Sequence, residues 1–160
     1  MNCMKRSWKP YLCGILLTEA VGGLAALLTR EATALYGSTI RKPPLSPPAV
    51  VFPIAWTILY ALMGVGAARI YRLPPSAERS TALRLFGIQL AVNFAWSILF
   101  FNFQAFGFAF FWLAVLWILI VRMILSFAEQ DRTAAWLQLP YLLWVLFAAY
   151  LNLGVWKLNG

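Results

Sequence analysis

The 160-residue sequence contains no histidine and only two cysteines. Without histidine, the chain cannot build a His-ligated zinc site, an axial His ligand for haem iron or a Ser-His-Asp triad. Cys3 and Cys13 form no CxxC motif and no paired spacing, so they indicate neither a disulfide nor a metal site. We therefore expect no metal in this protein.

Charged residues are also scarce, at 11% of the chain against 62% hydrophobic residues. The apolar residues come in long uncharged runs, such as Leu85 to Val121. A helix in the core of a soluble protein shows a polar face within every two turns, which these runs do not. The composition therefore predicts an integral, multi-pass membrane protein.

Acidic residues are the rarer charge, with five Asp and Glu against thirteen Lys and Arg, for a formal charge of +8. Because the basic residues are scattered between apolar runs, they do not form the patch that binds nucleic acid. We interpret them as topology and lipid-headgroup charges. Residues 1–29 imitate a signal peptide, but Glu19 inside the apolar stretch argues against cleavage.

Five membrane spans fit the sequence if about 20 residues at ~1.5 Å each make one crossing. They cover about residues 11–29, 49–70, 81–101, 106–128 and 134–156. We expect residues 1–160 to form a single all-α domain, a bundle of five transmembrane helices. The first connection, Arg30 to Pro48, contains the proline-rich segment Lys42 to Pro48, which cannot be regular helix. It is expected to be an extended loop or a cap over one end of the bundle.

The basic residues predict the orientation of the bundle. One side holds eight of them and the other four, and the positive-inside rule then places the N-terminus in the cytoplasm and the long first connection outside. The first group is Lys5, Arg6, Lys9, Arg69, Arg72, Arg79, Arg84 and Arg132, and the second is Arg30, Arg41, Lys42 and Lys157.

Small residues recur at four-residue spacing along the third span, as Gly87, Ala91 and Ala95. Such rows let helices approach closely in lipid. Two interpretations stay open: ordinary packing inside the bundle, and a homodimer formed through these three residues.

Polar and aromatic residues at membrane depth gather on one face of each of three spans. At ~1.5 Å of rise per residue, Trp56, Asn93 and Ala148 each fall about 10 to 12 Å below the outer edge. This convergence predicts a mostly apolar ligand pocket with a few orienting polar groups. The residues on the three faces are Pro53, Trp56 and Tyr60, then Gln89, Asn93, Trp96 and Ser97, then Tyr141, Trp144, Ala148 and Asn152. The candidate ligand residues among them are Trp56, Tyr60, Asn93, Trp96, Trp144, Ala148 and Asn152.

Other interpretations of these residues stand beside the pocket. An isolated intramembrane Asn can join helices to each other, and Trp residues at span ends, such as Trp8, Trp136 and Trp156, can be interfacial anchors. Glu19 and Arg122 are the charges furthest inside the spans, but one acid and one base do not make a proton relay.

Three motifs carry a resemblance to a known family. They are Pro43-Pro44-Leu45-Ser46-Pro47-Pro48 with Val51 to Gly64, then Gln89 to Ser97 with Phe100-Phe101, then Pro140 to Trp144 with Phe147-Ala148 and Leu151-Asn152. In this order and spacing the chain resembles the TspO/MBR family, also called tryptophan-rich sensory protein, translocator protein or peripheral-type benzodiazepine receptor. Leu153 and Leu45 depart from the family pattern, which has a tyrosine at the first position and often an aromatic residue at the second.

The resemblance implies a five-helix bundle, often dimeric, that binds porphyrins such as protoporphyrin IX and, in some members, sterols and benzodiazepine-type drugs. It implies no covalently bound cofactor; the porphyrin would be ligand or substrate. Tyr36, Trp56, Asn93, Trp144 and Ala148 match the positions of the family's ligand pocket. Trp56 and Trp144 match tryptophans linked in bacterial members to light- and oxygen-dependent porphyrin breakdown, and are the candidate catalytic residues.

The resulting hypothesis is a bacterial membrane receptor or sensor for a porphyrin or similar flat hydrophobic ligand, with a role in tetrapyrrole handling or the stress response. Two alternatives remain open. One is a light- and oxygen-dependent porphyrin-degrading enzyme, and the other is a transporter of porphyrin or a small lipid.

Overall fold

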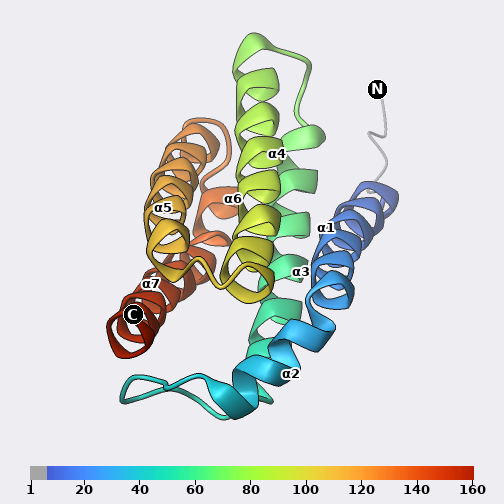
Figure 1. Ribbon diagram of the computed structural model, residues 1–160. Helices are drawn as coiled ribbons and strands as arrows, with labels where there is room; N and C mark the ends of the chain where they lie inside the picture. Colours follow the sequence, from blue (N-terminus) through green and yellow to red (C-terminus); the bar gives the residue numbers. More distant parts are fainter. Residues whose placement is uncertain (1–6) are drawn as a thin grey trace.

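A computed structural model describes residues 7–160 of the chain (Figure 1). Every regular element in this range is helical, and five helices are long and apolar enough to cross a membrane. This confirms the predicted all-α bundle of five transmembrane helices. The spans are α1 (Lys9–Leu28), α3 (Val51–Tyr71), α4 (Ala77–Ser97) continued by the π-helix η1 (Ile98–Asn102), α5 (Phe106–Ala128), and α6 (Arg132–Trp136) with α7 (Leu139–Asn159).

The helices pack side by side, with α1 along α3, α4 against α5, and α5 against α7 (Figure 1). One end of the bundle holds α2 (Arg30–Thr39), the proline-rich segment and the C-terminus, and we call it the loop end. The opposite end holds the start of α1, the α3–α4 connection and the α5–α6 turn, and we call it the N-terminal end (Figure 1).

The first connection was expected to be an extended loop or a cap over one end of the bundle, and its first half, Arg30–Thr39, forms the ten-residue helix α2. The chain bends between α1 and α2 at Thr29, whose hydroxyl donates a hydrogen bond to the Ala25 carbonyl at 2.8 Å. Ala, Leu and Glu in this segment favour helix once the bend has been made. The residues from Lys42 to Pro48 contain no helix.

The fifth span lies where it was predicted, as Arg132–Asn159, but its helix is interrupted. The helix stops after Trp136 and restarts at Leu139, with Pro140 in its first turn. Proline has no backbone N–H and is favoured at the start of a helix, so Pro140 divides the span into α6 and α7. The short helix α6 is capped by Asp131, whose Oδ1 accepts a hydrogen bond from the Ala134 amide at 3.2 Å.

Small residues hold α1 and α3 together. A Cβ atom on Gly14 would lie 2.4 Å from the backbone oxygen of Gly64, so any larger residue would separate the two helices. Gly87 differs, because a Cβ placed there would meet no atom within 4 Å. Gly87 and Ala91 lie exposed on the bundle surface, and the homodimer through Gly87, Ala91 and Ala95 stays a prediction.

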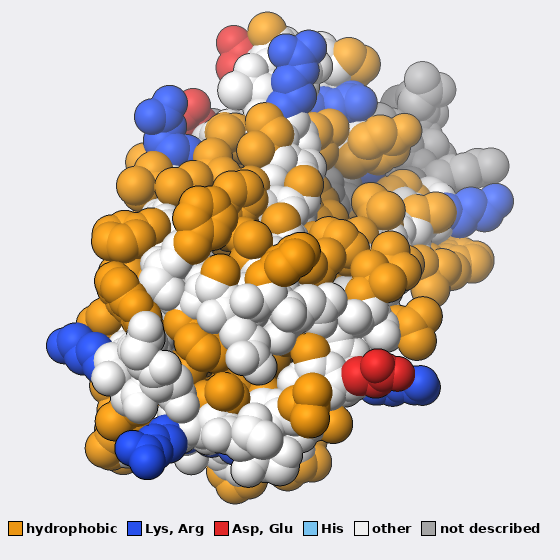
Figure 2. All heavy atoms as spheres, viewed as in Figure 1, with side chains coloured by type: hydrophobic (Ala, Val, Ile, Leu, Met, Phe, Trp, Pro, Cys, Tyr) orange, Lys and Arg blue, Asp and Glu red, His pale blue; other side chains and the backbone are white. Residues whose placement is uncertain are grey.

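The outside of the bundle is apolar. In Figure 2 hydrophobic side chains cover the middle of the visible face, and Lys and Arg lie mainly towards its edges and two ends. Exposed leucine, isoleucine and phenylalanine side chains occur on all the long helices. Such a surface suits lipid, which is as apolar as these side chains.

The two charges furthest inside the spans, Glu19 on α1 and Arg122 on α5, lie on the sides of the bundle. Glu19 is partly exposed and Arg122 is exposed. Within residues 7–160 the structure has one ion pair, between Arg69 and Asp131. Glu19 and Arg122 therefore do not pair with each other.

Candidate functional site

Two tryptophans from different helices meet in the half of the bundle nearer the loop end. The rings of Trp56 on α3 and Trp144 on α7 lie edge to face, with centroids 6.5 Å apart at an interplanar angle of 87°. Phe52, one turn before Trp56, extends the contact with its ring centroid 6.0 Å from that of Trp144. Both tryptophans are only partly buried, so part of each indole stays open to a ligand. We call Trp56 and Trp144 the tryptophan pair.

Two tyrosines continue this aromatic contact inwards. The Trp56 centroid lies 5.5 Å from that of Tyr60 and 6.3 Å from that of Tyr141. The Tyr141 hydroxyl donates a hydrogen bond to Gln89 Oε1 at 2.7 Å, and Asn93 Nδ2 donates to the Tyr60 hydroxyl at 3.5 Å. These four residues, Tyr60, Gln89, Asn93 and Tyr141, are buried and form what we call the polar network. The tryptophan pair therefore lies directly beside fixed polar groups.

Both polar atoms of the Asn152 side-chain amide form hydrogen bonds. Its Oδ1 accepts a hydrogen bond from Trp96 Nε1 at 3.1 Å, and its Nδ2 donates to the Phe106 carbonyl at 2.8 Å. Asn152 therefore joins α7 to α4 and to the start of α5, which is the helix-joining role that the sequence left open. Ala148 lies between Trp144 and Asn152 on the same face of α7, and is buried.

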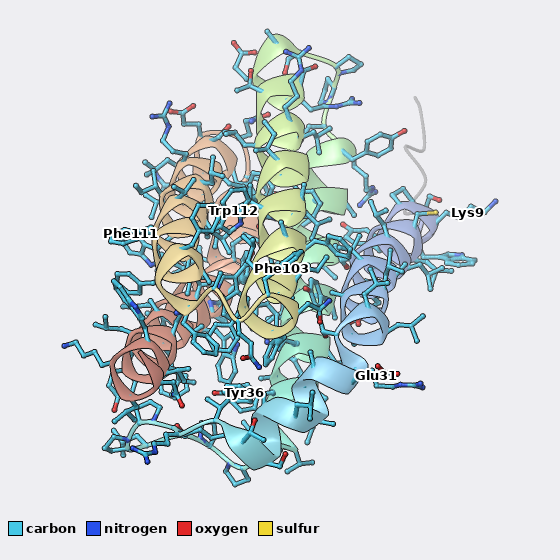
Figure 3. All side chains as sticks on the ribbon, in the orientation of Figure 1. Lys9, Glu31, Tyr36, Phe103, Phe111 and Trp112 are labelled. Atoms are coloured by element: carbon cyan, nitrogen blue, oxygen red, sulfur yellow. The ribbon has the colours of Figure 1, made fainter. Side chains whose placement is uncertain are left out.

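Tyr36 projects from α2 towards the end of the bundle (Figure 3). Its ring centroid lies 5.6 Å from that of Phe100 and 5.3 Å from that of Phe101, and Phe100 stacks on Trp96 at 5.2 Å. Both phenylalanines belong to the π-helix η1, and π-turns are frequent at functional sites. Burial raises the pKa of the Tyr36 phenol, which keeps it a neutral hydrogen-bond donor.

The proline-rich segment lies against the last turns of α7. The Tyr150 hydroxyl donates to the Pro44 carbonyl at 2.6 Å. The Asn159 side chain bonds the Arg41 backbone twice, accepting from its N–H at 3.0 Å and donating to its carbonyl at 2.8 Å. Pro43 packs on Gly154, where an added Cβ would lie 2.4 Å from the proline Cβ. Four separate contacts therefore hold Arg41 and the proline-rich segment on α7.

The eight predicted ligand residues fall into two neighbouring groups of contacts. Trp56, Tyr60, Asn93 and Trp144 belong to the first, and Tyr36, Trp96 and Asn152 to the second, with Ala148 between them on α7. All three helices on which the sequence predicted a polar and aromatic face contribute to these groups.

Gln89 and Tyr141 lie on the predicted helix faces, four and three residues from Asn93 and Trp144, but were not selected as ligand residues. Phe52 stands four residues before Trp56 and was detectable in the same way. The second bond partner of Asn152, the Phe106 carbonyl, has no signal in the sequence.

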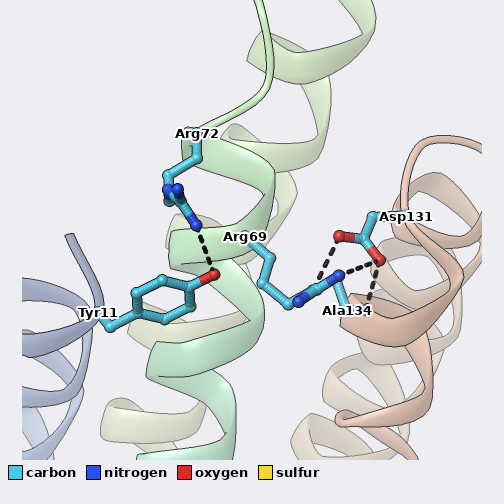
Figure 4. A network of polar contacts seen from close by, with 5 residues as sticks. All are labelled: Tyr11, Arg69, Arg72, Asp131 and Ala134. Carbon is cyan, nitrogen blue, oxygen red and sulfur yellow. Dashed lines mark hydrogen bonds and ion pairs between the residues drawn. The ribbon is translucent and has the colours of Figure 1, made fainter. Parts of the chain in front are cut away.

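A different kind of contact closes the N-terminal end (Figure 4). Arg69 on α3 donates to both carboxylate oxygens of Asp131, at 2.8 and 3.3 Å, and Arg72 Nη1 donates to the Tyr11 hydroxyl at 2.8 Å. Burial raises the pKa of Asp131, but hydrogen bonds from Arg69 and from the Ala134 amide outweigh it and lower the pKa below its ordinary value. At the N-terminal end, therefore, an ion pair joins α3 to the α5–α6 turn.

The chemistry available at the tryptophan pair is stacking and hydrogen bonding. Its groups are indole, phenol and amide, and within residues 7–160 no three His, Cys, Asp or Glu side chains come close enough to hold a metal ion. Cys13 is a free, exposed thiol on α1, and Cys3 lies outside the described residues.

The TspO/MBR family model matches residues 14–157 of the chain. The chain belongs to the TspO/MBR family. It is 38% identical over 149 residues to the tryptophan-rich protein TspO of Chlorobaculum tepidum, covering 92% of this chain and 94% of that protein. It is 32% identical to the tryptophan-rich sensory protein of Cereibacter sphaeroides, over 98% of this chain and 95% of that protein, and 32% identical to the translocator protein of Bos taurus, over 98% and 94%.

Membership of the TspO/MBR family and five apolar helices together make the chain an integral, multi-pass membrane protein. The names of these relatives describe tryptophan-rich, sensory and translocator proteins, and the relatives come from bacteria and from an animal. The matched region contains the tryptophan pair, the polar network and the proline-rich segment.

Proposed function

We propose that this protein is a membrane receptor or sensor that binds a porphyrin such as protoporphyrin IX, or a similarly flat hydrophobic molecule, in tetrapyrrole handling or the stress response. The ligand lies against Trp56 and Trp144, between α3, α4 and α7. The observation that carries the proposal is the tryptophan pair itself: two partly buried indoles from different helices, in contact beside a buried polar network.

The chemistry of the site suits such a ligand. Indole faces stack on a flat macrocycle, and a mostly apolar site with a few placed polar groups fixes the orientation of its ligand. Asn93 and Tyr60 supply those polar groups on the inner side. Tyr36, Phe100 and Trp96 cover the side towards the loop end, where the proline-rich segment closes over the bundle.

The test is a titration of detergent-purified protein with protoporphyrin IX, following tryptophan quenching and the porphyrin absorption band. Trp144→Phe and Asn93→Ala are the test variants, and Trp136→Phe, at the other end of the bundle, is the matched control. The loss of one aromatic contact of about 1 kcal/mol predicts affinity lower by about fivefold in Trp144→Phe.

Saturable binding that both test variants weaken and the control retains is the expected result. Binding that never saturates, or that Trp144→Phe and Trp136→Phe affect equally, would contradict the proposal. Because Asn93 is buried and bonded to Tyr60, the thermal unfolding midpoint of Asn93→Ala must be measured in parallel.

The direct contact between the tryptophans favours a second candidate function, light- and oxygen-dependent breakdown of the bound porphyrin. An indole is oxidisable, the porphyrin supplies light absorption, and molecular oxygen is the oxidant. Illumination of the complex with oxygen should give a product whose yield falls in Trp56→Phe and in Trp144→Phe at full ligand occupancy. An unchanged yield in both variants would limit the protein to binding.

We also propose that the N-terminal end faces the cytoplasm of a bacterial cell, on the basis of the eight basic residues counted on that side. Reporter fusions at the C-terminus test this, since an odd number of spans places the two ends of the chain on opposite sides. If a reporter that works only in the cytoplasm is active when fused to the C-terminus, the orientation is the reverse of the one proposed.

A further inference from the structure

A groove with a volume of about 350 Å³ lies at the N-terminal end of the bundle, where α5 meets α6 and the start of α7. It is separate from the tryptophan pair: neither Trp56 nor Trp144 lines it, and its Leu139 precedes Trp144 by about 7.5 Å of helix rise. The groove is lined by both sides of the interruption between α6 and α7, with Trp136 the last residue of α6 and Leu139 the first of α7. Its lining residues are Ile124, Ala128, Arg132, Ala135, Trp136 and Leu139.

The groove lies where a span ends, at the boundary between hydrocarbon and headgroups. Ala128 is the last residue of α5, and Ile124 lies one turn, or ~6 Å, deeper in the span. Trp136 is 69% exposed at the rim, and tryptophan is enriched at this depth of a bilayer. The apolar side chains therefore face the beginning of the hydrocarbon region, and the rim faces the headgroups.

The rim also carries a positive charge without a partner in the described protein. Arg132 is exposed, and its neighbour Asp131 is bound on both carboxylate oxygens by Arg69. Within residues 7–160 the one ion pair is that of Arg69 with Asp131, so no carboxylate forms an ion pair with Arg132. A guanidinium at headgroup depth complements a phosphate, which it binds through charge-assisted hydrogen bonds.

We infer that this groove binds an anionic phospholipid. The phosphate lies at Arg132, the indole of Trp136 lies beside the glycerol region, and the start of one acyl chain packs against Ile124, Ala128, Ala135 and Leu139. A volume of about 350 Å³ is at the lower end of the range for small-molecule sites, so it accommodates part of one chain and not a whole lipid. The charge of Arg132 selects an anionic lipid over a zwitterionic one.

The test reconstitutes the full chain in phosphatidylcholine vesicles in which a rising fraction is replaced by dibrominated phosphatidylglycerol, a quencher of tryptophan fluorescence. Subtracting the signal of Trp136→Phe isolates the response of Trp136. Arg132→Gln removes the rim charge, and Ala128→Phe fills the groove. Arg122→Gln is the matched control, since Arg122, on α5, is also an exposed arginine but does not line the groove.

Trp136 in the wild type should be quenched by brominated phosphatidylglycerol at about a fivefold lower fraction than by brominated phosphatidylcholine, as expected for one basic residue at the surface. Arg132→Gln should abolish this preference, Ala128→Phe should reduce quenching by both lipids, and Arg122→Gln should retain the wild-type response. High salt should weaken the preference.

Equal quenching by the two lipids in the wild type would overturn the inference. So would an equal loss of preference in Arg132→Gln and Arg122→Gln, because it would show a general surface charge effect. Circular dichroism establishes whether each variant is folded. If Arg132→Gln is altered in fold, Arg132→Lys replaces it as the test, because it keeps the charge and should retain at least half of the preference for phosphatidylglycerol.

Discussion

The two ends of the bundle are closed by different chemistry. At the N-terminal end, charge joins α3 to the α5–α6 turn through Arg69 and Asp131. At the loop end, neutral hydrogen bonds join α7 to the α2–α3 connection, from Tyr150 to the proline-rich segment and from Asn159 to Arg41 just before it. Single neutral bonds at an exposed position contribute little, so the segment can detach without unfolding the bundle. For the proposed ligand, this difference predicts entry to the tryptophan pair from the loop end.

The comparison is sharpest at two fully buried amides, one nearer each end. Asn152 forms two good hydrogen bonds, whereas Gln138 has one donor 3.4 Å from the Leu62 carbonyl and an Oε1 without a partner within the described residues. We expect Asn152→Leu to destabilise the protein by about 2 to 4 kcal/mol, because it leaves the Trp96 N–H buried and unpaired and removes the bond to the Phe106 carbonyl. Gln138→Leu should cost about 1 kcal/mol or less.

Equilibrium unfolding in mixed micelles measures both amide variants. Equal losses of unfolding free energy at Asn152 and Gln138 would contradict this account, because the two positions are equally buried and differ only in their hydrogen bonds.

The contact between Pro43 and Gly154 can be broken by a substitution that affects the loop end and leaves the N-terminal end unchanged. In Gly154→Ala the new methyl group would meet Pro43, so the proline-rich segment must shift, at a cost of about 1 to 3 kcal/mol to the closed loop. We expect proteolytic cleavage between α2 and α3 to rise by about tenfold or more, with the bundle still folded. Gly37→Ala is the matched control, since a Cβ there meets nothing within 4 Å. Similar cleavage rates in the two variants would be contrary to this prediction.

The ion pair at the N-terminal end should give a pH dependence that the loop end lacks. Asp131→Asn keeps a good helix cap for α6 but removes the charge, and should lower stability at pH 7 by about 1 kcal/mol for this partly exposed pair. Because the pKa of Asp131 is lowered in the folded protein, the stabilisation is complete above about pH 4 and is lost as the pH falls below that value.

Thermal unfolding of wild type and Asp131→Asn across pH 2 to 7 provides the test of this pH dependence. The two curves should converge in acid. A constant difference between them at every pH would mean that the aspartate acts through packing and not through its charge.

The smallest effect is expected at Asn159. Asn159→Ala removes two exposed hydrogen bonds to the Arg41 backbone, worth about 0.5 to 1 kcal/mol together. Loop cleavage should rise about two- to fivefold, and porphyrin should associate faster while the tryptophan pair stays intact. Stopped-flow quenching measures the association rate. An unchanged rate together with faster cleavage would show that the segment does not control access.

Most of the fold was predictable because transmembrane helices form from local properties. An apolar run of sufficient length must satisfy its backbone internally, so the spans follow from hydropathy alone. The helix boundaries that were not predicted depended on features that hydropathy does not register. Thr29 bends the chain into α2, and Pro140 restarts a helix that the apolar run had suggested was continuous.

The candidate site was predictable as a set of helix faces but not as a set of bonds. Spacing of three and four residues placed Trp56, Asn93 and Trp144 on converging faces. It could not tell that Asn152 joins helices with both ends of its amide, whereas Asn93 makes only one long bond to Tyr60. The partners that decide these roles come from other helices and, in one case, from a backbone carbonyl.

By itself the sequence determined that the protein lies in a membrane, crosses it five times, lacks the ligands of a His-based metal site and carries the motifs of its family. Only the tertiary structure decided which indoles touch, which buried amides are fully bonded and where α6 leaves a groove beside Arg132. The physical reason is that span formation depends on the transfer of one segment into lipid, whereas contacts and hydrogen bonds depend on how several segments pack together.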